Sequence, residues 1–213
     1  MSSDVLVTTP AQRQTEPHAE AVSRNRRQQA TFRKVLAAAM ATLREKSYAD
    51  LTVRRVAARA KVAPATAYTY FSSKNHLIAE VYLDLVRQVP CVTDVNVPMP
   101  IRVTSSLRHL ALVVADEPEI GAACTAALLD GGADPAVRAV RDRIGAEIHR
   151  RITSAIGPGA DPGTVFALEM AFFGALVQAG SGTFTYHEIA DRLGYVVGLI
   201  LAGANEPSTG GSE

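Results

Sequence analysis

Several residue types that support common protein functions are scarce in this chain of 213 residues. It holds only 2 cysteines, no tryptophan and 6% aromatic residues. Cys91 and Cys124 are too few for a disulfide framework and lack zinc-ligand spacing, so we expect ordinary reduced thiols. The histidines are likewise scattered without ligand spacing, which argues against a metal site; they are His18, His76, His109, His149 and His187.

Long apolar runs are also missing. The longest uncharged stretch, residues 170–187, includes Gln178, Ser181 and three glycines, whereas a bilayer span needs ~20 predominantly apolar residues. The N-terminus lacks the basic and then apolar pattern of a secretion signal. We therefore expect a cytoplasmic protein without a membrane partner.

Motifs of common catalytic sites are absent as well. The chain contains no Gly-rich phosphate loop, no Gly-x-Ser-x-Gly and no His-Glu-x-x-His sequence. We predict that the protein is not an enzyme and needs no cofactor.

The charged residues are distributed unevenly, although the net charge is only +1. Residues 22–78 hold 12 Lys and Arg against 2 Asp and Glu, whereas residues 91–213 hold 8 against 14. A basic lobe joined to an acidic one suggests that the first lobe meets a polyanion. A solvated basic surface without a partner is the alternative, and charge alone does not decide between the two.

Hydrophobic spacing indicates an all-α fold, because apolar residues recur with helical period and no segment alternates with the period of a strand. Residues 1–22 and 206–213 lack periodicity and are predicted to be disordered tails. In the first half, we predict helices over about residues 24–43, 53–60, 64–71 and 74–89. In the second half, we predict helices over about residues 101–116, 118–129, 135–157, 162–180 and 186–203.

Capping residues support these boundaries. Thr52 and Ser73 are good N-caps, and Pro64 suits a first helical position, where its missing N–H costs nothing. Asp134-Pro135 and Asp161-Pro162 are further start signals, and Thr185 with Glu188 forms a capping box.

The short helices 53–60 and 64–71 are separated by Lys61, Val62 and Ala63, which is the spacing of a helix-turn-helix. In that motif the first helix braces against the DNA backbone, and the second enters the ~12 Å major groove. A helical wheel places Ala67 and Phe71 inward. The opposite face is small, polar and uncharged with one aromatic residue, and it comprises Ala65, Thr66, Thr69 and Tyr70. Such a face suits groove contacts; a plain solvated helix would leave the exposure of Tyr70 without a reason.

These residues resemble the N-terminal domain of the TetR family of repressors. The similarity spans about residues 26–80, and its most specific part is Thr-x-Tyr-x-Tyr-Phe-x-Ser-Lys over residues 66–74. The resemblance implies a three-helix helix-turn-helix DNA-binding domain at residues 23–72. It also implies a C-terminal helical domain for ligand binding and dimerisation at residues 73–205.

The same resemblance implies roles for single residues. Thr52 matches a phosphate-contacting cap, Arg54 a base-reading position on the bracing helix, and Lys74 a phosphate-facing lysine. Tyr68 matches a backbone contact, and the groove-facing positions are Ala65, Thr66, Thr69 and Tyr70.

Three residues depart from the family pattern. Lys61 stands where a turn glycine is common, Ala63 where a Ser cap is frequent, and Ala67 where the core residue is larger. Arg24, Arg26 and Arg27 form either a minor-groove arm or simply a basic helix start near phosphates.

The last two predicted helices are apolar on more than one face, which is typical of helices shared with a partner. We interpret them as a two-fold interface, as the resemblance also implies. A homodimer would then place two recognition helices in successive major grooves of a near-palindromic operator, ~34–36 Å apart.

The resemblance further implies that a small apolar effector binds among the middle helices. The lining candidates are helical residues for which plain core packing is the alternative: His109, Cys124, Thr125, Met170, Phe173, Val177 and Gln178. The predicted function is a DNA-binding transcriptional regulator, a repressor released from its operator by this effector. The alternative is a regulator of the same fold that has no small-molecule effector and is controlled by a protein partner.

Overall fold

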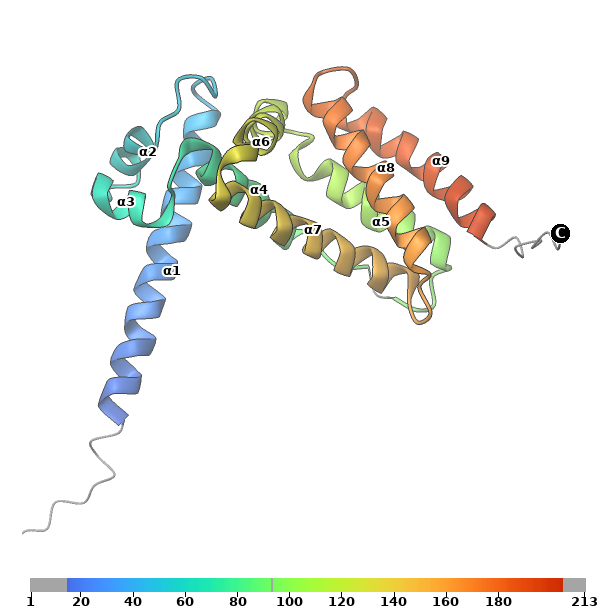
Figure 1. Cartoon of the computed structure of the whole chain (residues 1–213), viewed down its shortest axis with the longest axis horizontal. Coiled ribbons are helices and arrows are strands. Elements are labelled where there is room, and N and C mark those ends of the chain that lie inside the picture. The colour runs from blue at the N-terminus through green and yellow to red at the C-terminus, as the bar shows by residue number, and fades with distance from the viewer. Residues whose placement is uncertain (1–14, 93, 205–213) are drawn as a thin grey trace, which may run out of the picture.

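The described part of the chain consists of helices and loops (Figure 1). The computed structural model describes residues 15–92 and 94–204, with side chains from residue 25 onward. Within these residues no strand is present, which confirms the predicted all-α fold. The helices are α1 (Thr15–Leu43), α2 (Val53–Arg59), α3 (Pro64–Tyr70), α4 (Lys74–Gln88), α5 (Met99–Ala111), α6 (Pro118–Asp130), α7 (Pro135–Ile156), α8 (Pro162–Gly180) and α9 (Tyr186–Ala204).

Helix α1 begins earlier than the sequence predicts. It starts at Thr15 rather than near Arg24, so part of the predicted tail at residues 1–22 is helical. That segment contains two Glu and two Ala residues, which favour helix without forming the apolar face on which the prediction relied. The rest of the two predicted tails, residues 1–14 and 206–213, lies outside the described residues. Arg26 and Arg27 are exposed on this helix, which is the conformation of a basic helix start.

The predicted caps form as expected. Each supplies an acceptor to an N–H group that the first helical turn would otherwise leave unpaired. The contacts are Arg55 N to Thr52 Oγ1 (3.2 Å), His76 N to Ser73 Oγ (3.0 Å), Ala136 N to Asp134 Oδ1 (2.9 Å), Thr164 N to Asp161 Oδ2 (2.7 Å) and Glu188 N to Thr185 Oγ1 (3.2 Å). Glu188 Oε2 also accepts from Thr185 N at 2.8 Å, which completes the capping box.

Helix α4 connects the two ends of the molecule. One end is built by α1, α2 and α3, and the other by α5, α8 and α9, with α7 running between them (Figure 1). Helix α4 packs against α1 on one side and against α6 and α7 on the other. Its core side chains, including Leu77, Ile78 and Leu83, are fully buried. A displacement of α4 would therefore act on α1 and on α6 and α7.

Helix α8 is more apolar than we expected from the sequence. Among the described residues, Pro162–Gly180 is the one helix whose length and composition would suffice for a membrane span. Glu169 is the only charged residue of α8, and it separates the uncharged stretch 170–187 from the apolar residues before it. One such helix is weak evidence of a membrane, and α8 packs against α6, α7 and α9 as part of the helical bundle.

Candidate DNA-binding and effector-binding sites

Helices α2 and α3 form the expected helix-turn-helix, and Lys61 makes its turn. The backbone of Lys61 has a φ of 54°, the left-handed conformation that favours glycine. The amide of Lys61 donates to Ala58 O at 3.1 Å, and the amide of Val62 donates to Ala57 O at 3.0 Å. This pair of bonds is a Schellman motif that ends α2 and turns the chain into α3. Lys61 therefore holds a left-handed backbone conformation that glycine would adopt more easily.

The outer face of α3 differs from the predicted one at its two tyrosines. Ala65, Thr66 and Thr69 are exposed as predicted. Tyr70, predicted to point outward, is half-buried. Its ring packs edge-on against that of Phe32 of α1, with the two ring centres 6.1 Å apart. Tyr68, expected at the edge, is 52% exposed instead. A wheel drawn on α3 alone could not include the contact from α1 that covers one flank.

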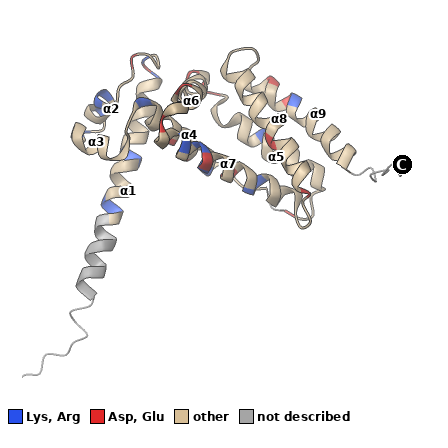
Figure 2. Cartoon of the chain, viewed as in Figure 1, with Lys and Arg blue, Asp and Glu red and all other residues tan. Residues whose placement is uncertain are grey.

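Basic side chains surround this unit on α1 and α2, whereas α3 carries no charge (Figure 2). Arg54 and Lys61 are exposed and form no ion pair with another described residue. Arg59 differs, because it is paired with Glu45 at 2.6 Å. Arg55 is also exposed and donates only to the Asp50 carbonyl. Arg54, Arg55 and Lys61 can therefore each meet an anion.

Lys74 is held by the protein itself. Its ammonium lies 4.1 Å from the centre of the Tyr48 ring and donates to the Tyr48 carbonyl at 3.1 Å. The predicted phosphate-facing lysine is thus half-buried at the start of α4. An ammonium has three donors, so this bond leaves two for another acceptor.

A cavity of about 630 Å³ lies between α4, α6, α7, α8 and the start of α9. Four of the predicted ligand residues line it: Cys124, Thr125, Phe173 and Val177. Three do not, and are exposed elsewhere on α5 and α8: His109, Met170 and Gln178. Helical spacing alone does not reveal which side of α5 or α8 faces a hollow.

Other residues that line the cavity were not predicted from the sequence, including Tyr82, Ile144 and Tyr186. Gly121 is essential for this shape, because a Cβ there would lie 2.3 Å from the hydroxyl oxygen of Tyr186. No local sequence signal links residues that are so far apart in the chain.

Burial moves the pKa values of the thiol and hydroxyl groups in the cavity wall further above neutral pH. Burial raises the pKa of the Cys124 thiol to about 12. It also raises the pKa of the Tyr82 hydroxyl, and that of Tyr186, where a hydrogen bond from Thr125 partly opposes the shift. Among the described residues, no group of three His, Cys, Asp or Glu side chains is placed to hold a metal ion.

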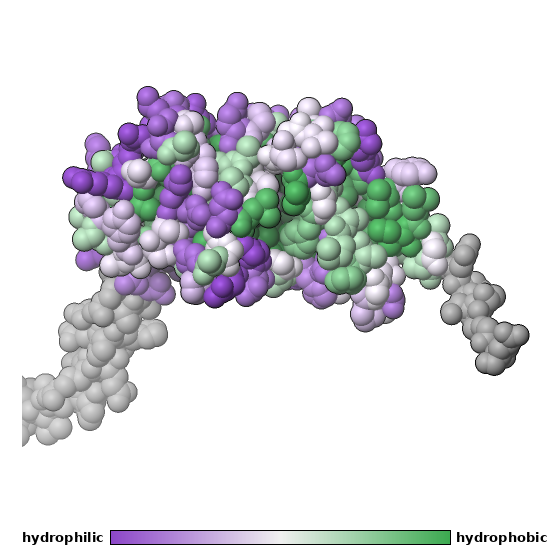
Figure 3. Space-filling view, turned by 45° about the horizontal axis from the view of Figure 1, so that its top comes forward, coloured by the Kyte–Doolittle hydropathy of each residue, from purple (hydrophilic) through white to green (hydrophobic). Residues whose placement is uncertain are grey.

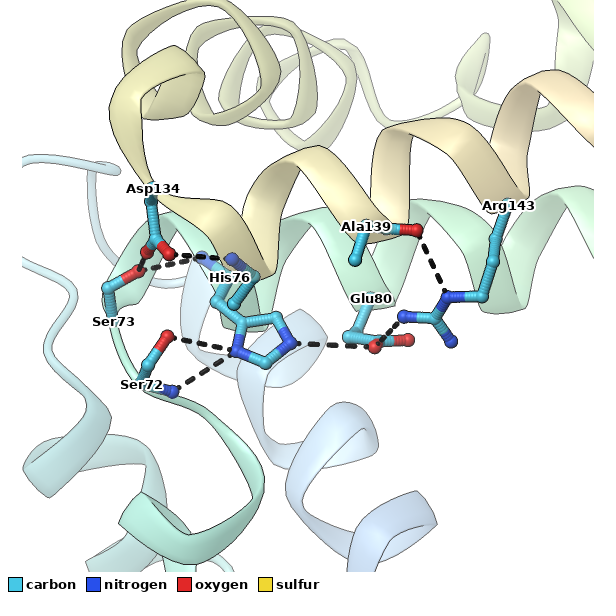
Figure 4. A network of polar contacts seen from close by, with 8 residues as sticks. Ser72, Ser73, His76, Glu80, Asp134, Ala139 and Arg143 are labelled. Carbon is cyan, nitrogen blue, oxygen red and sulfur yellow. Dashed lines mark hydrogen bonds and ion pairs between the residues drawn. The ribbon is translucent and has the colours of Figure 1, made fainter.

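The N-termini of α4 and α7 are joined by a hydrogen bond between their caps (Figure 4). Ser73 Oγ caps α4 and donates to Asp134 Oδ2 at 2.8 Å, while Asp134 caps α7. The bond from Ser73 is the main reason that the pKa of Asp134 is lowered. The turn after the recognition helix is thus tied to a helix that lines the cavity.

A second contact joins the same helices around Glu80, whose side chain is only 8% exposed (Figure 4). Arg143 of α7 donates to its carboxylate, and His76 Nε2 lies 3.5 Å from it. Ser72 N donates to His76 Nδ1 at 3.1 Å, which leaves the ring proton on Nε2, facing Glu80. Burial raises the pKa of Glu80, but the bonds from His76 and Arg143 together outweigh it and leave this pKa lowered.

The outer faces of α8 and α9 expose large apolar side chains. In Figure 3 hydrophobic residues gather over the end of the molecule built by these helices. The exposed residues are Phe166, Met170, Val177, Tyr195 and Leu199. On the opposite face of α8, Leu168 and Phe172 are fully buried. We call the five exposed residues the outer apolar face.

Comparison with known proteins supports the helix-turn-helix assignment. Residues 35–81 match the model of the N-terminal domain of bacterial regulatory proteins of the tetR family.

Several solved structures share the whole fold. A TetR transcriptional regulator from Rhodococcus sp. RHA1 is 21% identical, with a TM-score of 0.69, covering 84% of this chain and 98% of that one. Thermus thermophilus FadR, a TetR-family repressor solved with lauroyl-CoA, is 18% identical, with a TM-score of 0.60 and coverage of 85% and 99%. Bacillus subtilis FadR, solved with stearoyl-CoA, is 14% identical, with a TM-score of 0.54 and coverage of 81% and 98%.

Proposed function

Since residues 35–81 are a TetR-family N-terminal domain on a TetR-like helical fold, we propose that the protein is a transcriptional repressor. It binds operator DNA as a homodimer and releases it when a small, mostly apolar effector enters the cavity. One observation carries the proposal, namely the position of α4. Its first turn follows the recognition helix, and Tyr82, about two turns later, lines the cavity.

In this proposal α3 lies in the major groove. Ala65, Thr66 and Thr69 are exposed and small enough to approach base edges and thymine methyls, and Arg54 reads a base from α2. Phosphate contacts come from Thr52 and Tyr68, and from the remaining donors of Lys74. Tyr70 contributes at the flank, where its packing on Phe32 fixes the ring. The protein acts in the cytoplasm as a regulator without enzymatic activity, and turnover of any substrate would overturn that part.

The dimer forms through the outer apolar face. Exposed apolar patches of this kind mark interaction sites, and a two-fold axis lets one patch cover its own copy. The two recognition helices then meet half-sites ~34–36 Å apart.

The cavity favours a small-molecule effector over the alternative of control by a protein partner alone. A filled core would have supported the alternative, whereas a hollow of about 630 Å³ with mainly apolar walls is the kind of site that takes a small ligand. The effector would act by binding one orientation of α4 more tightly than the other, which shifts the population of DNA-competent dimers.

DNA binding is tested by fluorescence anisotropy with the intergenic duplex upstream of the protein's own gene and a scrambled duplex, at physiological salt. We expect binding at least ~10³-fold tighter to the native duplex, with two protomers per site. Arg54→Ala should weaken specific binding by about 1–3 kcal/mol and relax preference at one base position. Equal, weak binding to both duplexes, and to duplexes tiled across the neighbouring genes, would contradict the proposal.

Effector binding is tested by filling the cavity at Gly145. This residue lines the cavity, and a Cβ there would meet no heavy atom within 4 Å, so Gly145→Leu should fold normally. We expect N-phenyl-1-naphthylamine, which fluoresces in apolar surroundings, to bind the native protein but not this variant. Gly203→Leu, on α9 away from the cavity and equally open, is the matched control and should bind the dye normally. Equal dye binding by Gly145→Leu would show that the cavity is not the site.

A further inference from the structure

Helix α7 forms more of the cavity wall than α4 does. Of the described residues, α4 contributes Tyr82 to the lining. Helix α7 contributes a continuous stretch of its middle turns, namely Arg141, Asp142, Ile144, Gly145 and Ala146. A ligand in the cavity therefore acts on α4 mainly through the helices that pack against it. Two of these line the cavity, α6 and α7, so either could pass a displacement on to α4.

Polar contacts hold α7 to α4 at three levels. Two of them have been described, between the helix caps and around Glu80 (Figure 4). The third is made by Arg151 of α7, which is only 3% exposed and donates to Val89 O at 2.6 Å, directly after the end of α4. The bonded residues are 61, 63 and 62 positions apart in the chain. This nearly constant separation means that one register satisfies all three contacts, and a slide of α7 along α4 would break them together.

The contact between α4 and α6 is of a different kind. Among the described residues, the polar contact between these helices is the one from the Cys124 thiol to Ile78 O, with sulfur and oxygen 4.0 Å apart. A thiol is a weak donor, and apolar packing has no preferred direction. Helix α6 can therefore shift relative to α4 at less cost than α7 can.

His76 connects Glu80 to the end of the recognition helix. Its Nε2 lies 3.5 Å from the Glu80 carboxylate, and its Nδ1 accepts from Ser72 N at 3.1 Å. Its ring also packs edge-on against that of Phe71, with the ring centres 5.9 Å apart. Phe71 is fully buried and ends α3. A shift of Glu80 and His76 therefore acts directly on the last turn of α3.

We propose that Arg143 and Glu80 are positioning residues that transmit occupancy of the cavity to the recognition helix. A ligand displaces α7, and α7 carries α4 with it. Helix α4 does not stay behind, because Glu80 would then be buried without its arginine. The contacts of Ser73 and Arg151 keep the same register at the two ends of α4. The inference rests on the proposed effector site and names the route by which that site controls DNA binding.

The test measures how strongly the cavity and the operator are coupled. N-phenyl-1-naphthylamine is titrated into the native protein, both free and saturated with the operator duplex from the anisotropy experiment. The ratio of the two dissociation constants is the coupling factor, which equals the factor by which the dye weakens operator binding. We expect the native protein to bind the dye at least ~5-fold more weakly on the operator.

Arg143→Met removes the guanidinium and keeps an unbranched apolar side chain. Arg143 does not line the cavity, so the free variant should bind the dye with native affinity. Its coupling factor should fall to within about twofold of one. Arg143→Lys restores a cation and should give a coupling factor between those of Arg143→Met and the native protein. Arg138→Met is the matched control on α7, because Arg138 bonds to the carbonyls of the turn before that helix; it should keep the native coupling.

Circular dichroism establishes that each variant is folded. If Arg143→Met does not fold, Glu80→Gln, which keeps a neutral acceptor of the same shape, takes its place with the same expected loss of coupling. Native coupling in the folded variant, or an equal loss in Arg138→Met, overturns the inference and leaves α6 as the route, while release by an effector survives. Equal dye binding by the free and the operator-bound native protein would overturn both.

Discussion

At the scale of single residues, Lys61 combines an unfavourable backbone with an exposed charge. Its φ of 54° costs an L-residue about 1–2 kcal/mol relative to a right-handed conformation. Glycine avoids that cost, although it loses more backbone entropy on folding. Lys61 is exposed in the turn between α2 and α3. A contribution of its charge to DNA binding would offset the cost of its backbone conformation.

We predict that Lys61→Gly raises the free energy of unfolding by about 0.5–1 kcal/mol, because it relieves the left-handed strain. Lys61→Ala keeps the strain and removes only the charge, so its stability should stay within about 0.5 kcal/mol of the native value. Urea denaturation measures both. If the lysine meets a phosphate, both variants should lower the salt slope of DNA binding by about one. Equal stability of the two variants would show that the turn is not strained.

Tyr70 and Lys74 show what the sequence does not reveal at this scale. The family resemblance predicts that both lie near DNA, but the sequence does not reveal that Tyr70 packs on Phe32 or that Lys74 bonds to Tyr48. Both contacts come from α1 or the loop after it, distant in the chain. His109 is a similar case. It was predicted to line the cavity, but α5 is oriented so that this side chain is exposed at the surface.

At the scale of helices, the sequence predicted the fold well because helix starts are local. A cap and the N–H group that it pairs with lie two or three residues apart, so Asp134, Asp161 and Thr185 could be recognised without any knowledge of packing. The cavity is the opposite case. It exists because Gly121 leaves room for Tyr186, a pairing that only the folded chain brings together. The sequence therefore predicted four of its lining residues, but not Tyr82, Ile144 or Tyr186.

The contact between α4 and α7 also gives a prediction at this scale. The pKa of Glu80 lies below its ordinary value of 4.5 in the folded protein, so the charged carboxylate stabilises the fold above that pH. This stability is lost as the pH falls through the lowered pKa. We predict that Glu80→Gln lowers the free energy of unfolding by about 1–3 kcal/mol at pH 7, because Arg143 and His76 lose a charged acceptor. The difference from the native protein should shrink below pH 4.5.

Urea denaturation between pH 3.5 and pH 7 provides the measurement. Asp84→Asn is the matched control, since Asp84 lies one turn further along α4 and its carboxylate bonds to Gln88 on the same helix. The control should change stability little at any of these pH values. A loss in Glu80→Gln that is the same across the range would mean that packing of the side chain, rather than its charge, supports the contact.

At the scale of the whole molecule, the outer apolar face is the feature that a single chain leaves unexplained. The buried face of α8 already joins it to the bundle, yet Phe166 is 63% and Met170 54% exposed on the opposite side. Tyr195 and Leu199 on α9 are exposed to a similar extent. A membrane would also cover apolar residues, but a second copy of the chain agrees better with the proposed DNA binding through the exposed arginines of α1 and α2. The proposed mode of DNA binding, with two recognition helices, also requires a second copy.

We therefore predict that Met170→Glu combined with Leu199→Glu converts the dimer to a monomer in sedimentation velocity, because each charge would have to be buried without a partner. Helix content should be retained, since both side chains are exposed in the single chain. Specific operator affinity should fall by at least ~10²-fold, because the two recognition helices would then bind their half-sites independently instead of as one linked unit. Val95→Glu is the control, as Val95 is 82% exposed outside the outer apolar face and should leave both properties unchanged. A double variant that remains dimeric would place the interface elsewhere, whereas a monomer with full operator affinity would refute the two-fold mode of DNA binding.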